Sequence, residues 1–185
     1  LALPSIERFE AITDSHLKDV IRVMDVIYQF EQVLTEMTEK DLKTFKIPTN
    51  IRSRDKRIRY DEGTSIIKVY NDISGKLSSI DSIAREVSGT YDLELLPLEN
   101  TDIFKRVSRA EGNFILVFST RLLDLVGLAD RGIETCQTLT DSKTGNCIGL
   151  TKNNQRLLGT VISRYAGICY ITSGSKIKDR GEKML

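Results

Sequence analysis

The chain has 185 residues, of which 40% are hydrophobic and 29% charged, and its 27 basic and 26 acidic side chains leave a formal net charge of +1. This composition provides enough apolar material for a folded core and excludes an acidic tail or a disordered polyampholyte. No apolar run approaches the roughly eighteen residues of a membrane-spanning helix, so no membrane partner is predicted.

The two ends of the chain indicate a piece of a longer protein. The N-terminus reads Leu1-Ala2-Leu3-Pro4 and lacks the basic start and apolar run of a signal peptide. Residues 181–185 are charged and then apolar, like the first turn of a helix that is cut short. We therefore expect a fragment whose C-terminal domain is truncated.

Residues 14–46 carry the clearest helical pattern. Apolar residues recur every three or four positions and form one broad face, and Pro48 prevents the helix from continuing. Residues 1–45 hold nine acidic and five basic side chains. This helical arm over residues 1–48 is expected either to pack on its own domain or to bind a protein partner.

Residues 49–63 interrupt the helical pattern and form a predicted basic linker. Five cations lie within eight positions, and Ile58 and Tyr60 are placed to add apolar or stacking contacts. The cations are Arg52, Arg54, Lys56, Arg57 and Arg59. They can neutralise phosphates of a nucleic acid, an interpretation supported by the eight basic and two acidic residues of 143–185. The alternative is a solvated loop, or one that pairs with the acidic N-terminal helix.

From residue 64 onward, segments typical of strands alternate with segments typical of helices. The predicted strands are residues 64–70, 91–95, 114–118, 146–150, 157–164 and 168–172. The predicted helices are residues 77–89, 101–112 and 120–132, each closed by a glycine. The expected fold class is therefore α+β, with residues 64–185 forming an α+β domain after the helical arm and the linker.

The segment from residue 117 to 139 holds the candidate catalytic residues. A predicted strand delivers Ser119 to a helix N-terminus, Asp124 follows, and Cys136 lies in the turn after the helix. A thiol beside such a junction can act as a nucleophile. However, the one histidine, His16, would reach it only if the N-terminal helix folded back over the site. The alternative is a buried structural cysteine.

The three cysteines indicate a reducing compartment with free thiols. Their number is odd, and no pair has the short spacing of a zinc site. The chain also lacks the glycine motifs that bind nucleotides, so no cofactor is predicted. The expected location is the cytoplasm of a host cell or a virion.

Residues 114–172 resemble a segment of proteins from tailed bacteriophages and conjugative elements. The resemblance is carried by Ser119, Asp124, the pair Ala129-Asp130, the triplet Thr135-Cys136-Gln137 and the glycine-containing residues 145–150. This family has no settled activity, so the resemblance implies a viral or mobile-element origin rather than a reaction. Gln137 and Ala129 stand where the family often has His and Ser.

Three functions follow from these patterns. The first is a phage or mobile-element interaction domain that contacts nucleic acid through the basic segment. The second is a cysteine-dependent enzyme centred on Cys136, with Ser119 and Asp124 in support. The third is a structural subunit of a virion or large complex, which would bind its partner through the helix at residues 14–46.

Overall fold

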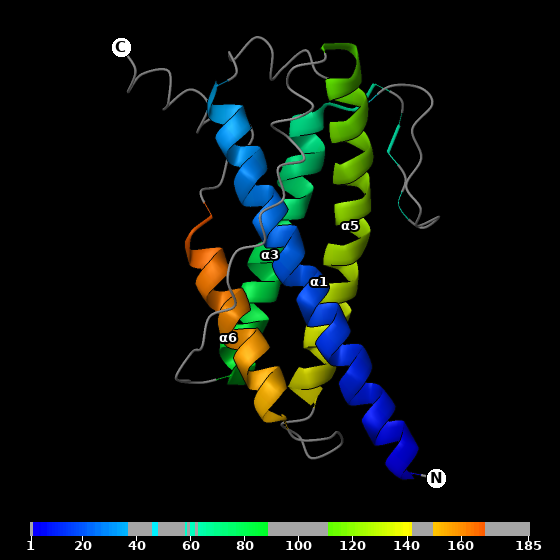
Figure 1. The fold of residues 1–185 in the computed structure, drawn as a ribbon, viewed down its shortest axis with the longest axis vertical. Helices are drawn as coiled ribbons and strands as arrows, with labels where there is room; N and C mark the ends of the chain where they lie inside the picture. The colour runs from blue at the N-terminus through cyan, green and yellow to red at the C-terminus, as the bar shows by residue number, and fades with distance from the viewer. Residues whose placement is uncertain are drawn as a thin grey trace. The chain divides into compact units, whose positions relative to one another are not determined.

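The computed structural model describes residues 2–36, 46–47, 58, 60–61, 63–88, 111–141 and 150–168 (Figure 1). These residues form the helices α1 (Ala2–Glu36), α3 (Ile66–Ser88), α5 (Glu111–Asp141) and α6 (Lys152–Ala166). Within these ranges the only β-type pairing is a single antiparallel bridge between Lys46 and Ser65. The predicted α+β fold class is therefore wrong, because the part of the chain that the structure describes is helical.

Three predicted strands lie inside helices. Residues 66–70 open α3, residues 114–118 belong to α5, and residues 157–164 belong to α6. The burial pattern of α3 gives the reason, because its buried positions recur at helical spacing rather than at every second residue. These positions are Ile66, Val69, Tyr70, Ile73, Leu77 and Ile80. The predicted strand at 91–95, most of those at 146–150 and 168–172, and most of the helix at 101–112 lie outside the described residues.

Two of the three predicted helix ends at glycines were wrong. Gly112 and Gly132 lie inside α5, which continues to Asp141, whereas α3 ends at Ser88, next to the predicted end at Gly89. The start of α6 is fixed by its N-cap, since the Thr151 hydroxyl accepts a 3.0 Å hydrogen bond from the Asn154 backbone N–H. Residues 157–164, which were predicted to form a strand, belong to the helix that follows this cap.

The chain divides into two compact units. The first unit comprises Leu1–Asp25, Lys76–Glu99 and Leu128–Ile168, and the second comprises Val26–Gly75, Asn100–Gly127 and Cys169–Leu185. Most of the apolar face predicted for the N-terminal helix is buried between Leu17 and Phe30, although Tyr28 on this face is 39% exposed. Burial of this face favours packing within the chain over the predicted protein partner.

In the first unit, α1 and α6 run in the same direction. Asn153 donates a 2.6 Å hydrogen bond to Asp14, and Arg164 forms a 3.0 Å ion pair with Asp25. Both helices therefore advance by the same eleven residues, about three turns, between these two contacts. The helices α3 and α5 run in the opposite direction (Figure 1).

Gly132 lies at a close approach between helices in the first unit. A Cβ atom at this position would lie 2.3 Å from Cγ2 of Val20 on α1 and 3.1 Å from Cδ1 of Ile80 on α3. The absence of a side chain thus allows α5 to pack against α1 and α3 here. The core around it is formed by buried residues of all four helices, including Leu17, Val20, Leu77, Ile80, Ala129, Leu139, Leu157 and Val161.

The core of the second unit is built around two aromatic rings. Phe30 on α1 and Tyr70 on α3 have ring centroids 5.4 Å apart, and both are buried. The Tyr70 hydroxyl donates a hydrogen bond to the buried carboxylate of Glu31. This bond places a polar contact inside an otherwise apolar core, formed also by Ile27, Ile47, Ile66, Val69, Ile73, Leu122 and Val126.

Candidate functional site

The two ends of the predicted basic linker are held together in the second unit. The Ile47 N–H donates to the Thr64 carbonyl at 2.8 Å, and the Gly63 N–H donates to the Ile47 carbonyl at 3.2 Å. Gly63 has a φ of 81°, a left-handed conformation that glycine adopts without strain. Ile47 is buried, so this pairing is fixed to the core of the unit.

The five predicted phosphate-contacting residues, Arg52, Arg54, Lys56, Arg57 and Arg59, lie outside the described residues. Their neighbour Tyr60 is described, and its hydroxyl donates a 2.8 Å hydrogen bond to Asp72 on α3. Within the second unit, Tyr60 therefore attaches one end of the basic segment to α3, and Ile47 attaches the other end to the core. The role predicted for its cations stays a prediction.

The predicted catalytic residues are not brought together. Ser119, Asp124 and Cys136 all lie on α5, and side chains of one helix meet only at spacings of three or four residues. Cys136 is separated from the other two by several turns of that helix. The predicted turn at Cys136 is instead part of the helix, so no strand-to-helix junction presents the thiol.

The Cys136 thiol is buried and uncharged at neutral pH. Its side chain has no exposed surface, and burial raises its pKa from 9.0 to about 12. A nucleophilic cysteine requires the thiolate, which a positive neighbour or a helix N-terminus normally stabilises. Ser119 is buried as well, whereas Asp124 is partly exposed. The arrangement supports the structural alternative for Cys136.

Cys136 is expected to resist alkylation in the folded protein. At pH 8 a pKa of about 12 reduces the thiolate fraction about a thousand-fold relative to a thiol of pKa 9.0, and burial blocks access in addition. The measurement is iodoacetamide labelling of a Cys147→Ser, Cys169→Ser variant, followed across a guanidinium titration. We expect labelling to begin only with unfolding. Native labelling at the rate of a free thiol would contradict the assignment.

His16 contacts the residue next to Cys136 rather than the thiol. Its Nδ1 lies 2.9 Å from the hydroxyl oxygen of Thr135 on α5. Thr135 donates its own proton to the Arg131 carbonyl at 2.9 Å, so the oxygen accepts from His16 and Nδ1 carries the proton. Thus α1 does fold against α5 in the first unit, but it does not supply a base to Cys136.

The electrostatic surroundings keep His16 uncharged. Burial and then the Arg131 cation lower the pKa of His16 from 6.5, and the carboxylates of Asp19 and Glu134 oppose this shift. A neutral imidazole is consistent with a single donated hydrogen bond to Thr135. His16 is therefore a structural link between α1 and α5.

The lowered pKa predicts that the protein loses stability as the pH falls through about 6.5. Below that pH the unfolded chain binds a proton at His16 that the folded chain does not, so the free energy of unfolding decreases until the folded pKa is reached. Chemical denaturation between about pH 7.5 and 5.5 measures the effect, since carboxylates titrate lower. His16→Asn, which keeps a donor near Nδ1, should remove the slope. A slope that survives in this variant would contradict the prediction, because the chain has no other histidine.

Comparisons with family models, curated proteins and solved structures found no match to this chain. No helix among the described residues is long and apolar enough to cross a membrane. The described residues also contain no cluster of three or more His, Cys, Asp or Glu side chains that could hold a metal ion. The resemblance to phage and conjugative-element proteins stays a prediction.

The polar contacts between α1 and α6 were not predicted from the sequence. The ion pair between Asp25 and Arg164 is almost fully buried, with side-chain exposures of 3% and 13%. Asp14 and Asn153 form the second contact, and Asn153 also accepts a 2.8 Å hydrogen bond from Arg156. The two contacting residues are eleven positions apart on each helix. This equal spacing could have predicted the two contacts only if both segments had already been assigned to helices.

Proposed function

We propose that the protein is a helical interaction module of phage or mobile-element origin that binds nucleic acid through its basic segment. The cations of this segment are Arg52, Arg54, Lys56, Arg57 and Arg59. Clustered cations bind phosphates largely without regard to base sequence. The proposal requires that these cations are not already neutralised by the chain itself.

The observation that carries the proposal is that most of the carboxylates described on α1 already have partners within the chain. Asp19 pairs with Arg22 at 3.4 Å, Asp25 pairs with Arg164, Asp14 accepts from Asn153, and Glu31 accepts from Tyr70. Asp25 and Glu31 are also buried. Most of the acidic groups described on α1 therefore have partners, which weakens the alternative that this helix neutralises the basic segment.

The enzyme alternative receives no support from the arrangement of its residues. Cys136 is buried with a raised pKa, and neither Ser119 nor Asp124 can reach it along α5. The structural-subunit alternative relied on an unpartnered apolar face of the N-terminal helix. Most of that face is buried between Leu17 and Phe30, with Tyr28 as an exposed member.

Mobility-shift titrations with duplex DNA and single-stranded RNA at two salt concentrations test the proposal. If all five cations contact phosphates, log K for duplex DNA should fall with log salt with a slope of about −4.5. Reversing all five to Glu should abolish the shift. Binding that is unaffected by this reversal would overturn the proposal.

A matched pair of double variants controls for total charge. Arg54→Gln with Arg57→Gln removes two cations of the segment, and Lys68→Gln with Arg121→Gln removes two exposed cations from α3 and α5. Only the first pair should reduce the salt slope, by about 1.8. An equal reduction in both pairs would show that net charge, rather than the segment, governs binding.

A further inference from the structure

The outer face of the α1–α6 pair in the first unit carries cations from both helices. Lys18 and Arg22 are exposed on α1 and lie one turn apart, and Lys152 and the half-buried Arg156 lie one turn apart on α6. Asp14 on α1 contacts Asn153 on α6. Lys18 lies one turn after Asp14, and Arg156 lies one turn after Asn153, so these two cations flank the same contact between the helices.

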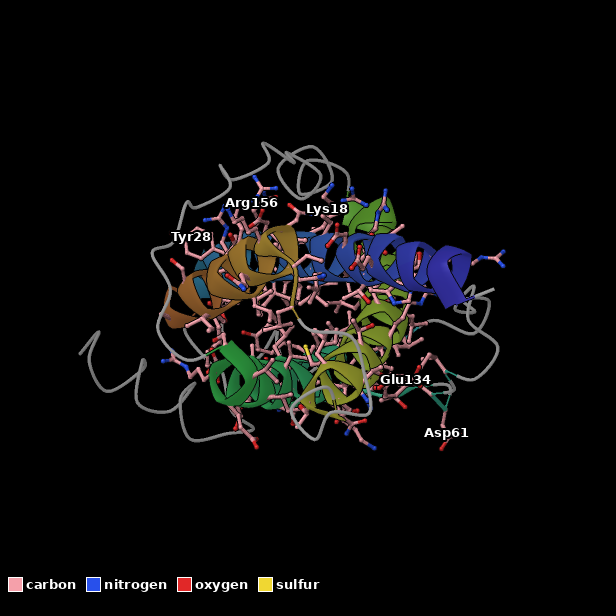
Figure 2. All side chains as sticks on the ribbon, turned by 90° about the horizontal axis from the view of Figure 1, so that it is seen from below. Lys18, Tyr28, Asp61, Glu134 and Arg156 are labelled. Atoms are coloured by element: carbon pink, nitrogen blue, oxygen red, sulfur yellow. The ribbon has the colours of Figure 1, made fainter. Side chains whose placement is uncertain are left out.

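Figure 2 shows both side chains on the same outer side of the first unit. Glu134, an exposed acid of α5, lies on the opposite side of the unit in that view. Lys18 and Arg156 therefore share one side of the first unit, and Glu134 does not lie among them.

Three acidic groups near this face, Asp14, Asp19 and Asp25, are partly or fully buried. Asp25 is buried against Arg164, and one oxygen of Asp14 is buried while the other accepts from Asn153. Asp19 is 23% exposed, compared with 54% for its partner Arg22. The four cations outnumber the half-buried acids Asp14 and Asp19 that lie near them, which favours the approach of an anion to this face.

The two helices hold these cations at a spacing suited to a phosphodiester backbone. Cations one turn apart are separated by about 6 Å along a helix, and packed helices lie about 8–10 Å apart. Duplex DNA carries one charge per roughly 1.7 Å of its axis, so such an array meets several phosphates. Arg156 is held in position by its bond to Asn153.

We propose that the outer face of the α1–α6 pair, formed by Lys18, Arg22, Lys152 and Arg156, is a second contact surface for the phosphate backbone of duplex nucleic acid. The inference rests on the proposed function, because it names nucleic acid as the ligand. It differs in placing part of the binding on α1 and α6 in addition to the basic segment. The contact is independent of base sequence, since phosphates carry no sequence information.

The test compares Lys18→Gln with Lys152→Gln against the control pair Lys68→Gln with Arg121→Gln. Arg156 is left intact because it contacts Asn153, and Arg22 is left intact because it pairs with Asp19. The face variant should reduce the salt slope for duplex DNA by about 1.8 and leave the circular dichroism spectrum and denaturation midpoint unchanged. The control pair should leave the slope unchanged. An unchanged slope in the face variant would overturn the inference.

The outcomes distinguish this inference from the proposed function. If reversal of the basic segment abolishes binding and the face variant binds normally, the inference fails and the proposed function stands. If the face variant weakens binding while segment reversal has no effect, the proposed segment is wrong and the face is the binding surface. Binding to vesicles of equal parts phosphatidylserine and phosphatidylcholine, without binding to DNA, would overturn both.

Discussion

Replacing Asp25 by Asn is expected to destabilise the protein by about 3–5 kcal/mol, because it removes the buried carboxylate that lies against the Arg164 guanidinium. The two groups lie 3.0 Å apart, with only 3% and 13% of their side chains exposed. Removal of a buried charge from water is costly, and the attraction of its partner offsets that cost only while both groups are present. Guanidinium denaturation at pH 7, followed by circular dichroism, measures the loss.

The exposed pair on the same helix provides the control. Arg22 contacts Asp19 at 3.4 Å, and Arg22 is 54% exposed. Surface pairs contribute about 0–1 kcal/mol, so Arg22→Gln should change the free energy of unfolding by no more than that. A loss at Asp25→Asn as small as that at Arg22→Gln would contradict the assignment of a buried pair.

An apolar double variant tests whether the pair stabilises the fold or only avoids a penalty. Asp25→Leu with Arg164→Met removes both charges and keeps side-chain volume at the contact between α1 and α6. Such replacements of buried pairs are often neutral or stabilising. We expect the double variant to recover most of the stability that Asp25→Asn loses.

The part of the fold that the sequence predicted best is the amphipathic stretch of α1. Its buried positions, among them Leu17, Met24 and Ile27, follow the apolar face read from the sequence. Hydrophobic periodicity suffices there because the segment is long and polar on its other side. Its start at Ala2 was not predicted, since the helical pattern was read from residue 14 onward.

The remaining helices were divided or missed for two physical reasons. The predicted strand at residues 64–70 and the predicted helix from residue 77 belong to one helix, α3, which contains Gly75. The cost of a helical glycine is about 1 kcal/mol, which burial of Ile73 and Leu77 outweighs. The continuous apolar run at residues 114–118 is compatible with a buried strand or a buried helix, and periodicity alone cannot separate them.

The candidate site depended on contacts that are remote in sequence. His16 and Thr135 are 119 residues apart, and no local pattern brings them together. The burial of Cys136 was the alternative that the sequence analysis kept open, and it is the one that the structure supports. The spacing of the residues did not decide between a catalytic and a structural cysteine. The polar residues around Cys136 were predicted to form a turn, whereas they continue α5.

Replacing Gly132 by Ala is expected to destabilise the protein by about 1–3 kcal/mol, although alanine favours helices. The added Cβ would lie 2.3 Å from Cγ2 of Val20, a β-branched side chain with one preferred rotamer in a helix. Relief therefore requires movement of α1 or α5. Gly75→Ala is the matched control, since no atom lies within 4 Å of its Cβ position. It should stabilise the protein by about 0.4–1 kcal/mol.

The two substitutions gain similar helix propensity, so the difference between their denaturation midpoints isolates the contact with Val20. Val20→Ala in the Gly132→Ala background removes the obstructing methyl group. If close approach of α1 and α5 is the cause, the double variant should be more stable than the sum of the single variants requires, with a coupling of about 0.5–3 kcal/mol. Additive effects, or a Gly132→Ala protein as stable as Gly75→Ala, would contradict this packing. A positive coupling would show that glycine is required at position 132 because α1 and α5 pack closely there, and not because a helix ends there.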